Sequence, residues 1–223
     1  MSRQQLIAII MNAQTQSFSL VGAAGHLECK LDLPAPNTPQ GIALIAHPHP
    51  LYGGSLDNKV VQTLARAFLA LGYVCARMNF RGVGNSAGTH DHGIGETEDM
   101  ALLHTHMVNA YPGLPVALAG FSFGTFVLSR LQQQLTMQNQ AALRLVLVGC
   151  AAGKWDLAPV PANTLLIHGE QDDTIPLADV FEWARPQDLP VVVIPGADHF
   201  FHRKLHHIKQ LVIAALHGNS AGG

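Results

Sequence analysis

From Gly41 onwards, short and nearly continuous apolar runs alternate with longer amphipathic stretches. A strand is continuously apolar when helices cover both faces of its sheet, and such sheets are built from parallel strands. The six apolar runs are 42–46, 73–78, 116–119, 143–148, 164–167 and 191–194. Because the 223 residues contain no linker or repeat, the pattern predicts one doubly wound, mostly parallel α/β domain over residues 1–223.

The stretches between the apolar runs predict helices. One begins near Asp57, carries its apolar side chains on one face and ends before Gly72, a typical C-terminal stop. Another begins near Gly95, where three carboxylates in the first turn would favour the positive end of the helix dipole. Further helices are expected from Ser122 or just after it, over 176–184 and over 202–216.

The N-terminal part has a different pattern. Segments 17–21 and 26–33 predict antiparallel strands joined by a turn at 22–25, and the Pro-rich stretch 34–39 predicts a surface loop. The apolar run 6–11 follows Arg3, as in a signal peptide, but it is shorter than the roughly 7–15 residues of an h-region. We therefore interpret it as a first strand. Residues 217–223 are expected to form a flexible tail.

Composition excludes several classes of protein. The net charge is −2, and only 13% of the residues are charged, which is unlike a nucleic-acid binder or a membrane-surface protein. No apolar run approaches the length of a membrane span. Cys29, Cys75 and Cys150 are widely spaced, and each falls in an expected strand. We interpret them as reduced packing residues of a cytoplasmic protein rather than as nucleophiles.

The segment Leu118-Ala-Gly-Phe-Ser122-Phe-Gly-Thr125 carries the strongest chemical signal. A strand enters Gly-x-Ser-x-Gly, and a helix follows at once, which is the context of a nucleophile elbow. Such a turn strains the backbone at the serine and brings its flanking residues together, where Gly120 and Gly124 have no Cβ to collide. The pattern predicts that Ser122 is a nucleophile and that the Phe123 amide faces a developing oxyanion.

Two later strand ends supply an acid and a base. The segment 165–176 runs from a strand through Gly169 into a loop that contains Asp172 and Asp173, and 193–201 leads from a strand to His199. Active sites of such sheets lie beyond the carboxyl ends of the strands, so these loops can meet Ser122. Asp198 adjoins the histidine in sequence, which places its side chain poorly for a bond to the ring. The order Ser, Asp, His predicts a catalytic triad.

Several motifs together resemble the small, lidless α/β-hydrolase-superfamily proteins of bacteria, in the dienelactone-hydrolase-like and esterase-like branch. The motifs are His47-Pro-His-Pro-Leu-Tyr-Gly-Gly54, Asn79-Phe-Arg-Gly-Val-Gly-Asn-Ser86, Gly-Phe-Ser122-Phe-Gly, His-Gly-Glu-Gln-Asp172 and Gly-Ala-Asp-His199-Phe-Phe. The resemblance implies an ester hydrolase that uses neither a metal nor an organic cofactor. Dienelactone hydrolases have a Cys nucleophile where this chain has Ser122, so that specific activity is not implied.

The resemblance also guides the roles of individual residues. The family's acid falls on Asp172, three residues after the loop glycine, and Asp173 is free to cap the helix that follows. The second oxyanion donor is expected in the loop after 42–46, where prolines lack an N–H. By analogy His49 is preferred, with Leu51 or Tyr52 as alternatives.

Other conspicuous residues receive structural interpretations. Arg81 could contact an anionic substrate, but we favour a partnership with Glu96 or Asp99. The 13 histidines suggest a metal, yet no ligand set of the usual spacing is present, so the face formed by residues 202, 206 and 207 is interpreted as solvated. His90 and His92 are expected in a surface loop near the site. Trp155 and Trp183 are expected to pack against the core.

The chain between the runs ending at 148 and starting at 164 is too short for a helical lid. We expect an open site for a small-molecule ester with a short acyl chain. Alternatives are thioester, peptide or lactone hydrolysis, acyl transfer, and a non-catalytic protein that binds a ligand in the same pocket. No nucleic-acid or membrane partner is expected, and a homodimer is left open.

Overall fold

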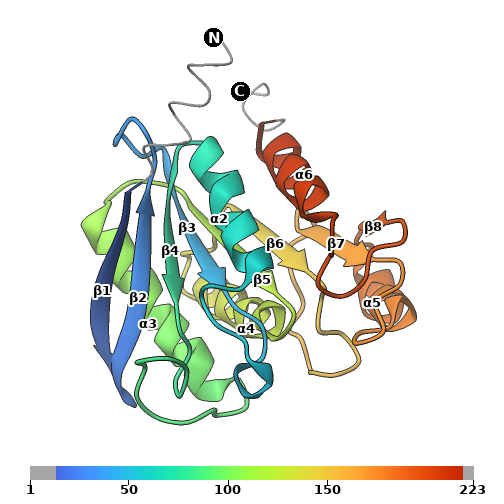
Figure 1. Ribbon diagram of the computed structural model, residues 1–223, viewed down its shortest axis with the longest axis horizontal. Helices are drawn as coiled ribbons and strands as arrows, with labels where there is room; N and C mark the ends of the chain where they lie inside the picture. Colours follow the sequence, from blue (N-terminus) through green and yellow to red (C-terminus); the bar gives the residue numbers. More distant parts are fainter. Residues whose placement is uncertain (1–13, 218–223) are drawn as a thin grey trace.

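The computed structural model describes residues 14–217, in which eight strands form one mixed sheet (Figure 1). The strand order is β1-β2-β4-β3-β5-β6-β7-β8. Strands β1 and β2 form a hairpin, β2 pairs antiparallel with β4, and the remaining pairs are parallel. The strands are β1 (Gln14–Gly22), β2 (Gly25–Leu33), β3 (Gly41–Ala46), β4 (Tyr73–Met78), β5 (Val116–Phe121), β6 (Arg144–Val148), β7 (Leu165–Gly169) and β8 (Val191–Ile194). The predicted α/β sheet with antiparallel N-terminal strands is confirmed.

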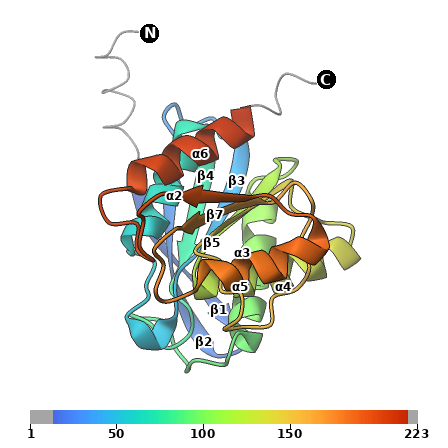
Figure 2. The ribbon, with the colours of Figure 1, turned by 90° about the vertical axis from the view of Figure 1, so that its right-hand side faces the viewer.

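Helices cover both faces of the sheet, as the apolar strands require. Helices α2 and α6 lie on one face, and α3, α4 and α5 lie on the other (Figures 1 and 2). Each face therefore has its own buried apolar layer. The helices are α2 (Lys59–Ala70), α3 (Ile94–Ala110), α4 (Phe123–Met137), α5 (Leu177–Ala184) and α6 (Leu205–His217), with short 3₁₀ turns η1 (Pro50–Tyr52) and η2 (Arg185–Gln187).

Local capping explains where the helices begin. The Asn58 side chain accepts the Val60 amide at 2.8 Å and starts α2 two residues later than predicted. Glu96 accepts the Gly93 amide at 2.8 Å and starts α3. Helix α6 begins at Leu205 rather than at residue 202, because Asp198 holds the amide and the ring of His202 in the preceding turn.

Several boundary predictions are wrong by a few residues. Strand β5 continues to Phe121, and β7 covers Leu165–Gly169. Cys150 lies just beyond β6 rather than within a strand, whereas Cys29 and Cys75 are in β2 and β4. The predicted first strand at 6–11 and the residues of the tail from 218 onwards lie outside the described residues. Within 14–217, none of the helices combines the length and apolarity needed to cross a bilayer.

Candidate active site

Ser122 occupies the turn between β5 and α4. Its backbone has φ 54° and ψ −123°, a conformation that L-residues rarely adopt. A Cβ on Gly120 would lie 2.8 Å from the carbonyl group of Gly124, and a Cβ on Gly124 would lie 2.6 Å from the Ala46 oxygen. Both glycines are therefore required by close backbone contacts, as the motif predicts. The Thr125 hydroxyl donates to the Ser122 carbonyl at 2.6 Å and closes the turn.

The loops after β7 and β8 bring the acid and the base to this serine. His199 Nε2 lies 3.0 Å from Ser122 Oγ, and His199 Nδ1 lies 2.7 Å from Asp172 Oδ2. Asp172 accepts from its ring as a carboxylate, so Nδ1 carries the proton and Nε2 can accept the serine hydroxyl. All three residues are buried. The structure thus brings all three predicted side chains into one hydrogen-bonded chain.

The Asp172 carboxylate is held by its own loop. Its Oδ1 accepts the amides of Thr174 at 3.0 Å and Ile175 at 2.7 Å. Burial alone would raise the pKa of Asp172, but the hydrogen bonds from His199 and Ile175 outweigh burial and lower the pKa below its usual value. The carboxyl group therefore stays ionised at neutral pH.

Asp173 and Asp198, the two alternatives to Asp172 as the acid, do not hydrogen-bond to the ring of His199. Asp173 is exposed and does not cap α5, whose N-cap is Pro176, so the predicted capping role is wrong. Helix α5 has no side-chain cap, and Asp172 accepts the amides of Thr174 and Ile175, which precede the helix. Asp198 bonds His202, with its Oδ2 2.6 Å from Nδ1, rather than His199. Asp172 is the acid that contacts the histidine.

A buried histidine beside the acid was not singled out from the sequence. His168 Nε2 lies 2.9 Å from the Ile175 carbonyl oxygen and 3.4 Å from Asp172 Oδ2. Burial lowers the pKa of His168 and keeps the ring neutral. Its bond to Ile175 ties the end of the acid loop to β7. The available signal was its position at a strand end, directly before the loop glycine.

The loop after β3 borders the serine and offers backbone donors. The Leu51 amide donates to His49 Nδ1 at 3.2 Å, and the amides of Tyr52 and Gly54 donate to the His49 carbonyl at 3.2 and 3.1 Å. Within the described chain, the His49 amide has no such partner. The Phe123 amide, at the first position of α4, has no intrahelical acceptor either. Both residues line the pocket that contains Ser122.

A pocket of about 550 Å³ contains Ser122 and His199. Aromatic rings form part of its wall, and the ring centroid of His49 lies 4.7 Å from Tyr52, 4.8 Å from Phe123 and 5.5 Å from Trp155. Trp155 therefore lines the site as well as packing against Phe126, which corrects its assignment to packing alone. Trp183 packs against the core as expected.

Contacts with buried carboxylates show where Arg81 and His90 lie. Arg81 makes a two-pronged pair with Asp99, with distances of 2.8 and 2.9 Å, which confirms the structural interpretation of this arginine. His90 lies in a loop near the site, as predicted, with its ring centroid 4.6 Å from that of His49; its side chain is only 5% exposed, and its Nδ1 lies 2.8 Å from Glu96 Oε1. His92 lies in the same loop and is exposed.

The other histidines predicted to be solvated do not form a metal site. His206 and His207 are in α6 with ring centroids 4.0 Å apart, whereas His202 lies outside that helix. Among residues 14–217, no group of three or more His, Cys, Asp or Glu side chains has the arrangement needed to hold a metal ion.

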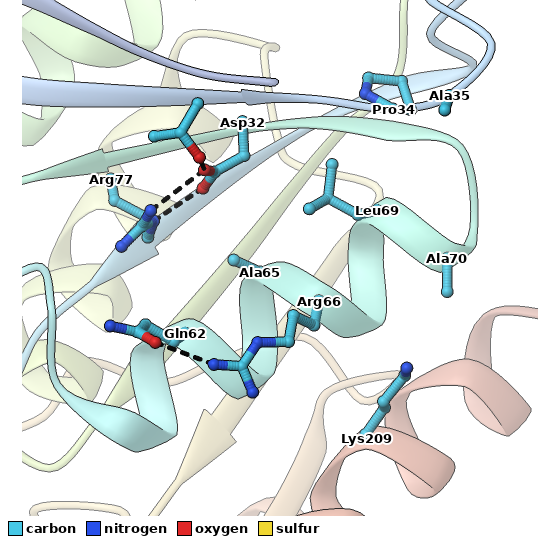
Figure 3. A pocket seen from close by; sticks show the side chains of 11 residues that line it. Asp32, Pro34, Ala35, Gln62, Ala65, Arg66, Leu69, Ala70, Arg77 and Lys209 are labelled. Atoms are coloured by element: carbon cyan, nitrogen blue, oxygen red, sulfur yellow. Dashed lines mark hydrogen bonds and ion pairs between the residues drawn. The ribbon is translucent and has the colours of Figure 1, made fainter. Parts of the chain in front are cut away.

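A second pocket, of about 360 Å³, lies between β2, β4, α2 and α6 (Figure 3). The buried Asp32–Arg77 pair, joined at 2.8 and 3.1 Å, forms one wall, and Arg66 and Lys209 approach the space from two helices. Its lining includes neither a serine nor a histidine. The hydrogen-bonded pair of Ser122 and His199 therefore lines the first pocket and not this one.

Comparison with known proteins supports the reading of the fold. A family model described as "Serine aminopeptidase, S33" matches residues 51–166, which include Ser122 but neither Asp172 nor His199. A crystal structure of a lidless α/β serine hydrolase from Xanthomonas campestris is 35% identical, with a TM-score of 0.84 over 92% of this chain and 94% of that chain. The chain belongs to the α/β serine hydrolases.

Two further proteins extend the range of relatives of this α/β serine hydrolase. A serine hydrolase homologue from Coxiella burnetii is 33% identical, with a TM-score of 0.78 over 90% of this chain and 97% of that chain. An uncharacterized protein of Rickettsia prowazekii is 32% identical over 195 residues, covering 80% of this chain and 78% of the relative. In the α/β serine hydrolase described here, the connection between β6 and β7 contains no helix, consistent with a lidless fold.

Proposed function

We propose that this α/β serine hydrolase cleaves carboxylic esters of small, short-acyl substrates through an acyl-enzyme. The observation that carries the proposal is the unbroken chain Ser122–His199–Asp172, with both contacts within hydrogen-bond distance. Ser122 attacks the acyl carbon while His199 takes its proton, and His199 then protonates the leaving alcohol. Asp172 orients the ring and stabilises the imidazolium. Water repeats the sequence on the acyl-enzyme and regenerates Ser122.

The amides of Phe123 and His49 are proposed to stabilise the oxyanion. The Phe123 amide is at the positive end of α4, next to the nucleophile. The His49 amide is preferred over those of Leu51 and Tyr52, because both of these already donate to His49 within the η1 turn. Two backbone donors aimed at one oxygen are the usual device for acyl transfer in water-excluded sites.

Neither a metal nor an organic cofactor has a step in this proposal, because His199 carries out every proton transfer and Asp172 orients its ring. The cysteines are not alternative nucleophiles, since burial raises the pKa of Cys29 and Cys150 to about 12 and raises that of Cys75 well above its usual value. Three buried free thiols favour a reducing compartment, and we propose the cytoplasm. The proposed partner is a small molecule.

The short-acyl preference is supported by the site itself. The pocket is a cavity of about 550 Å³, and the β6–β7 loop does not supply a helix to enclose a long chain. The test is hydrolysis of p-nitrophenyl esters of increasing acyl length. We expect kcat/KM to peak at short chains and to decline with length. A maximum at C12 or beyond would contradict the proposed substrate class.

A peptidase is the second candidate, because the matched family model is described as a serine aminopeptidase. A panel of esters, thioesters and aminoacyl arylamides separates the candidates when it is run on the wild type beside Ser122→Ala. We expect ester hydrolysis to dominate and to disappear in the variant. A fluorophosphonate probe tests the non-catalytic alternative, since a folded protein whose Ser122 is not labelled at neutral pH would be a binding protein.

A further inference from the structure

His47 follows β3 directly and is fully buried, yet the mechanism above gives it no role. Its Nε2 lies 2.9 Å from the backbone nitrogen of Phe80, and its Nδ1 lies 2.6 Å from the carbonyl oxygen of Pro48. An amide N–H can only donate, so Nε2 is the acceptor. In the neutral ring the proton is therefore on Nδ1, where it is donated to the Pro48 carbonyl.

The Pro48 carbonyl and the His49 amide belong to the same peptide unit. A peptide is planar, so a group that fixes the direction of its C=O also fixes the opposite direction of its N–H. We propose that His47 is a positioning residue that clamps the Pro48–His49 peptide and thereby aims the His49 N–H at the oxyanion. This inference rests on the proposed function and on His49 as the second oxyanion donor.

The same peptide is confined from other sides. A Cβ on Gly54 would lie 2.1 Å from the Pro48 oxygen, so the chain folds back on this carbonyl and only glycine fits there. A Cβ on Gly124 would lie 2.8 Å from the His47 oxygen, which places the start of α4 against the residue that makes the clamp. The clamp and the nucleophile elbow are thus in direct backbone contact.

The His47 ring keeps the same protonation state, so its Nδ1 always donates to Pro48. Burial lowers the pKa of His47 to about 4, despite the opposing effect of its bond to Pro48, so the ring stays neutral at the pH where a neutral imidazole base works. A hydrogen bond to a peptide carbonyl also polarises that peptide and strengthens its N–H as a donor. Position and polarisation both act on the N–H that faces the site.

Two substitutions separate the two bonds of the ring. In His47→Asn, the side-chain NH₂ takes the place of Nδ1 and can still donate to Pro48, but nothing accepts the Phe80 amide. In His47→Gln, the side-chain oxygen reaches the place of Nε2 and can accept the Phe80 amide, but the donor to Pro48 is lost. The clamp predicts that Gln is the damaging change, whereas a purely structural role predicts no such order.

The experiment measures kcat and KM on a short-chain p-nitrophenyl ester, together with inhibition by a trifluoromethyl ketone that forms an oxyanion on Ser122. Loss of one oxyanion donor costs about 10²–10³ in kcat, and we expect His47→Gln to lose about 100-fold with KM nearly unchanged. The inhibition constant should rise in parallel. The kcat of His47→Asn should be at least tenfold higher than that of His47→Gln. His104 is buried but does not line the pocket, so His104→Gln should have the kcat of the wild type.

Gly54→Ala tests the same peptide without touching the ring. The new Cβ must displace the Pro48 carbonyl, so kcat should fall while KM is retained, even if His47→Gln does not fold. The proposal is overturned if folded His47→Gln stays within threefold of wild type, if His47→Asn is as impaired as His47→Gln, or if Gly54→Ala keeps its kcat. Activity that persists in Ser122→Ala would instead overturn the proposed function, and the two failures are distinguishable.

Discussion

At the residue scale, the acid is specified by contacts and not by its residue type. Asp172 and Asp173 are adjacent and chemically identical, but Asp172 accepts three hydrogen bonds, from His199 and from the amides of Thr174 and Ile175. Asp173 is exposed. The difference arises because one side chain points into the loop it begins, where two amides are left without other acceptors.

The neighbouring carboxylates give a matched pair of variants. Asp172→Asn keeps the size of the side chain but removes the charge and favours the wrong tautomer of His199, so kcat should fall about 10³- to 10⁴-fold. Asp173→Asn makes the same chemical change one residue later and should leave kcat within twofold. Steady-state ester hydrolysis measures both. Equal effects of the two variants would show that Asp172 is not the acid of the triad.

Gly124 couples the elbow to the end of β3. Gly124→Ala would press a Cβ within 2.6 Å of the Ala46 oxygen, and overpacking against backbone costs about 1–3 kcal/mol. We expect urea unfolding to show this loss. Gly113→Ala is the comparison, because a Cβ there has no atom within 4 Å, and its cost comes only from the positive φ. Gly124 is helical and has no positive φ, so a loss in Gly124→Ala no larger than that in Gly113→Ala would show that the close contact with β3 is not costly.

At the scale of elements, helix α3 is fixed to the sheet end by a buried ion pair. The Arg81 side chain is 9% exposed and that of Asp99 is 2% exposed, and the pair anchors the loop after β4 to α3. More distant carboxylates at 3.6 and 3.8 Å, Asp91 and Glu98, support the same guanidinium. The bond to Asp99 raises the pKa of Arg81, which keeps this buried group charged.

Removing one partner of this pair should be costly. Asp99→Asn leaves the guanidinium with a neutral partner in a buried position, and we expect the free energy of unfolding to fall by about 3 kcal/mol. Glu182→Gln is the control, because its partner Arg185 and Glu182 itself are largely exposed, and exposed pairs contribute about 0–1 kcal/mol. Urea titration of both variants checks the ordering, which a loss below 1 kcal/mol for Asp99→Asn would contradict.

The bounds of strands and helices could be predicted from the sequence where local residues define them. They were misplaced where contacts between distant residues define them. Strands β4 and β8 have the predicted bounds, because polar or turn residues flank them on both sides. The start of α6 was misplaced, since only the fold shows that Asp198 holds His202 in a turn. The ordering of Asp172 over Asp173 came from family spacing. The roles of His47 and His168 depend on carbonyl contacts that no local pattern displays.

At the scale of the whole molecule, the site is the meeting point of loops from four strands. Strands β3, β5, β7 and β8 end at the same edge of the sheet, and their loops supply His49, Ser122, Asp172 and His199. A parallel sheet makes this convergence geometric, because the carboxyl ends of its strands share an edge. Two buried rings contact these loops, with His47 bonded to Pro48 and His168 bonded to Ile175.

Three buried histidine rings predict how the stability of the whole chain depends on pH. Burial lowers the pKa of His47 to about 4 and also lowers those of His104 and His168, whereas the unfolded chain binds these protons near pH 6.5. Between pH 6.5 and 4 the unfolded state therefore holds more protons, and stability must fall as the pH falls, by up to about 1.4 kcal/mol per pH unit for each proton. Urea unfolding across this range measures the slope. His104→Gln should reduce it, and exposed His206→Gln should not. A wild-type free energy of unfolding that stays constant over this range would mean that the buried rings are protonated in the folded protein, and the neutral donor assigned to His47 would then be wrong.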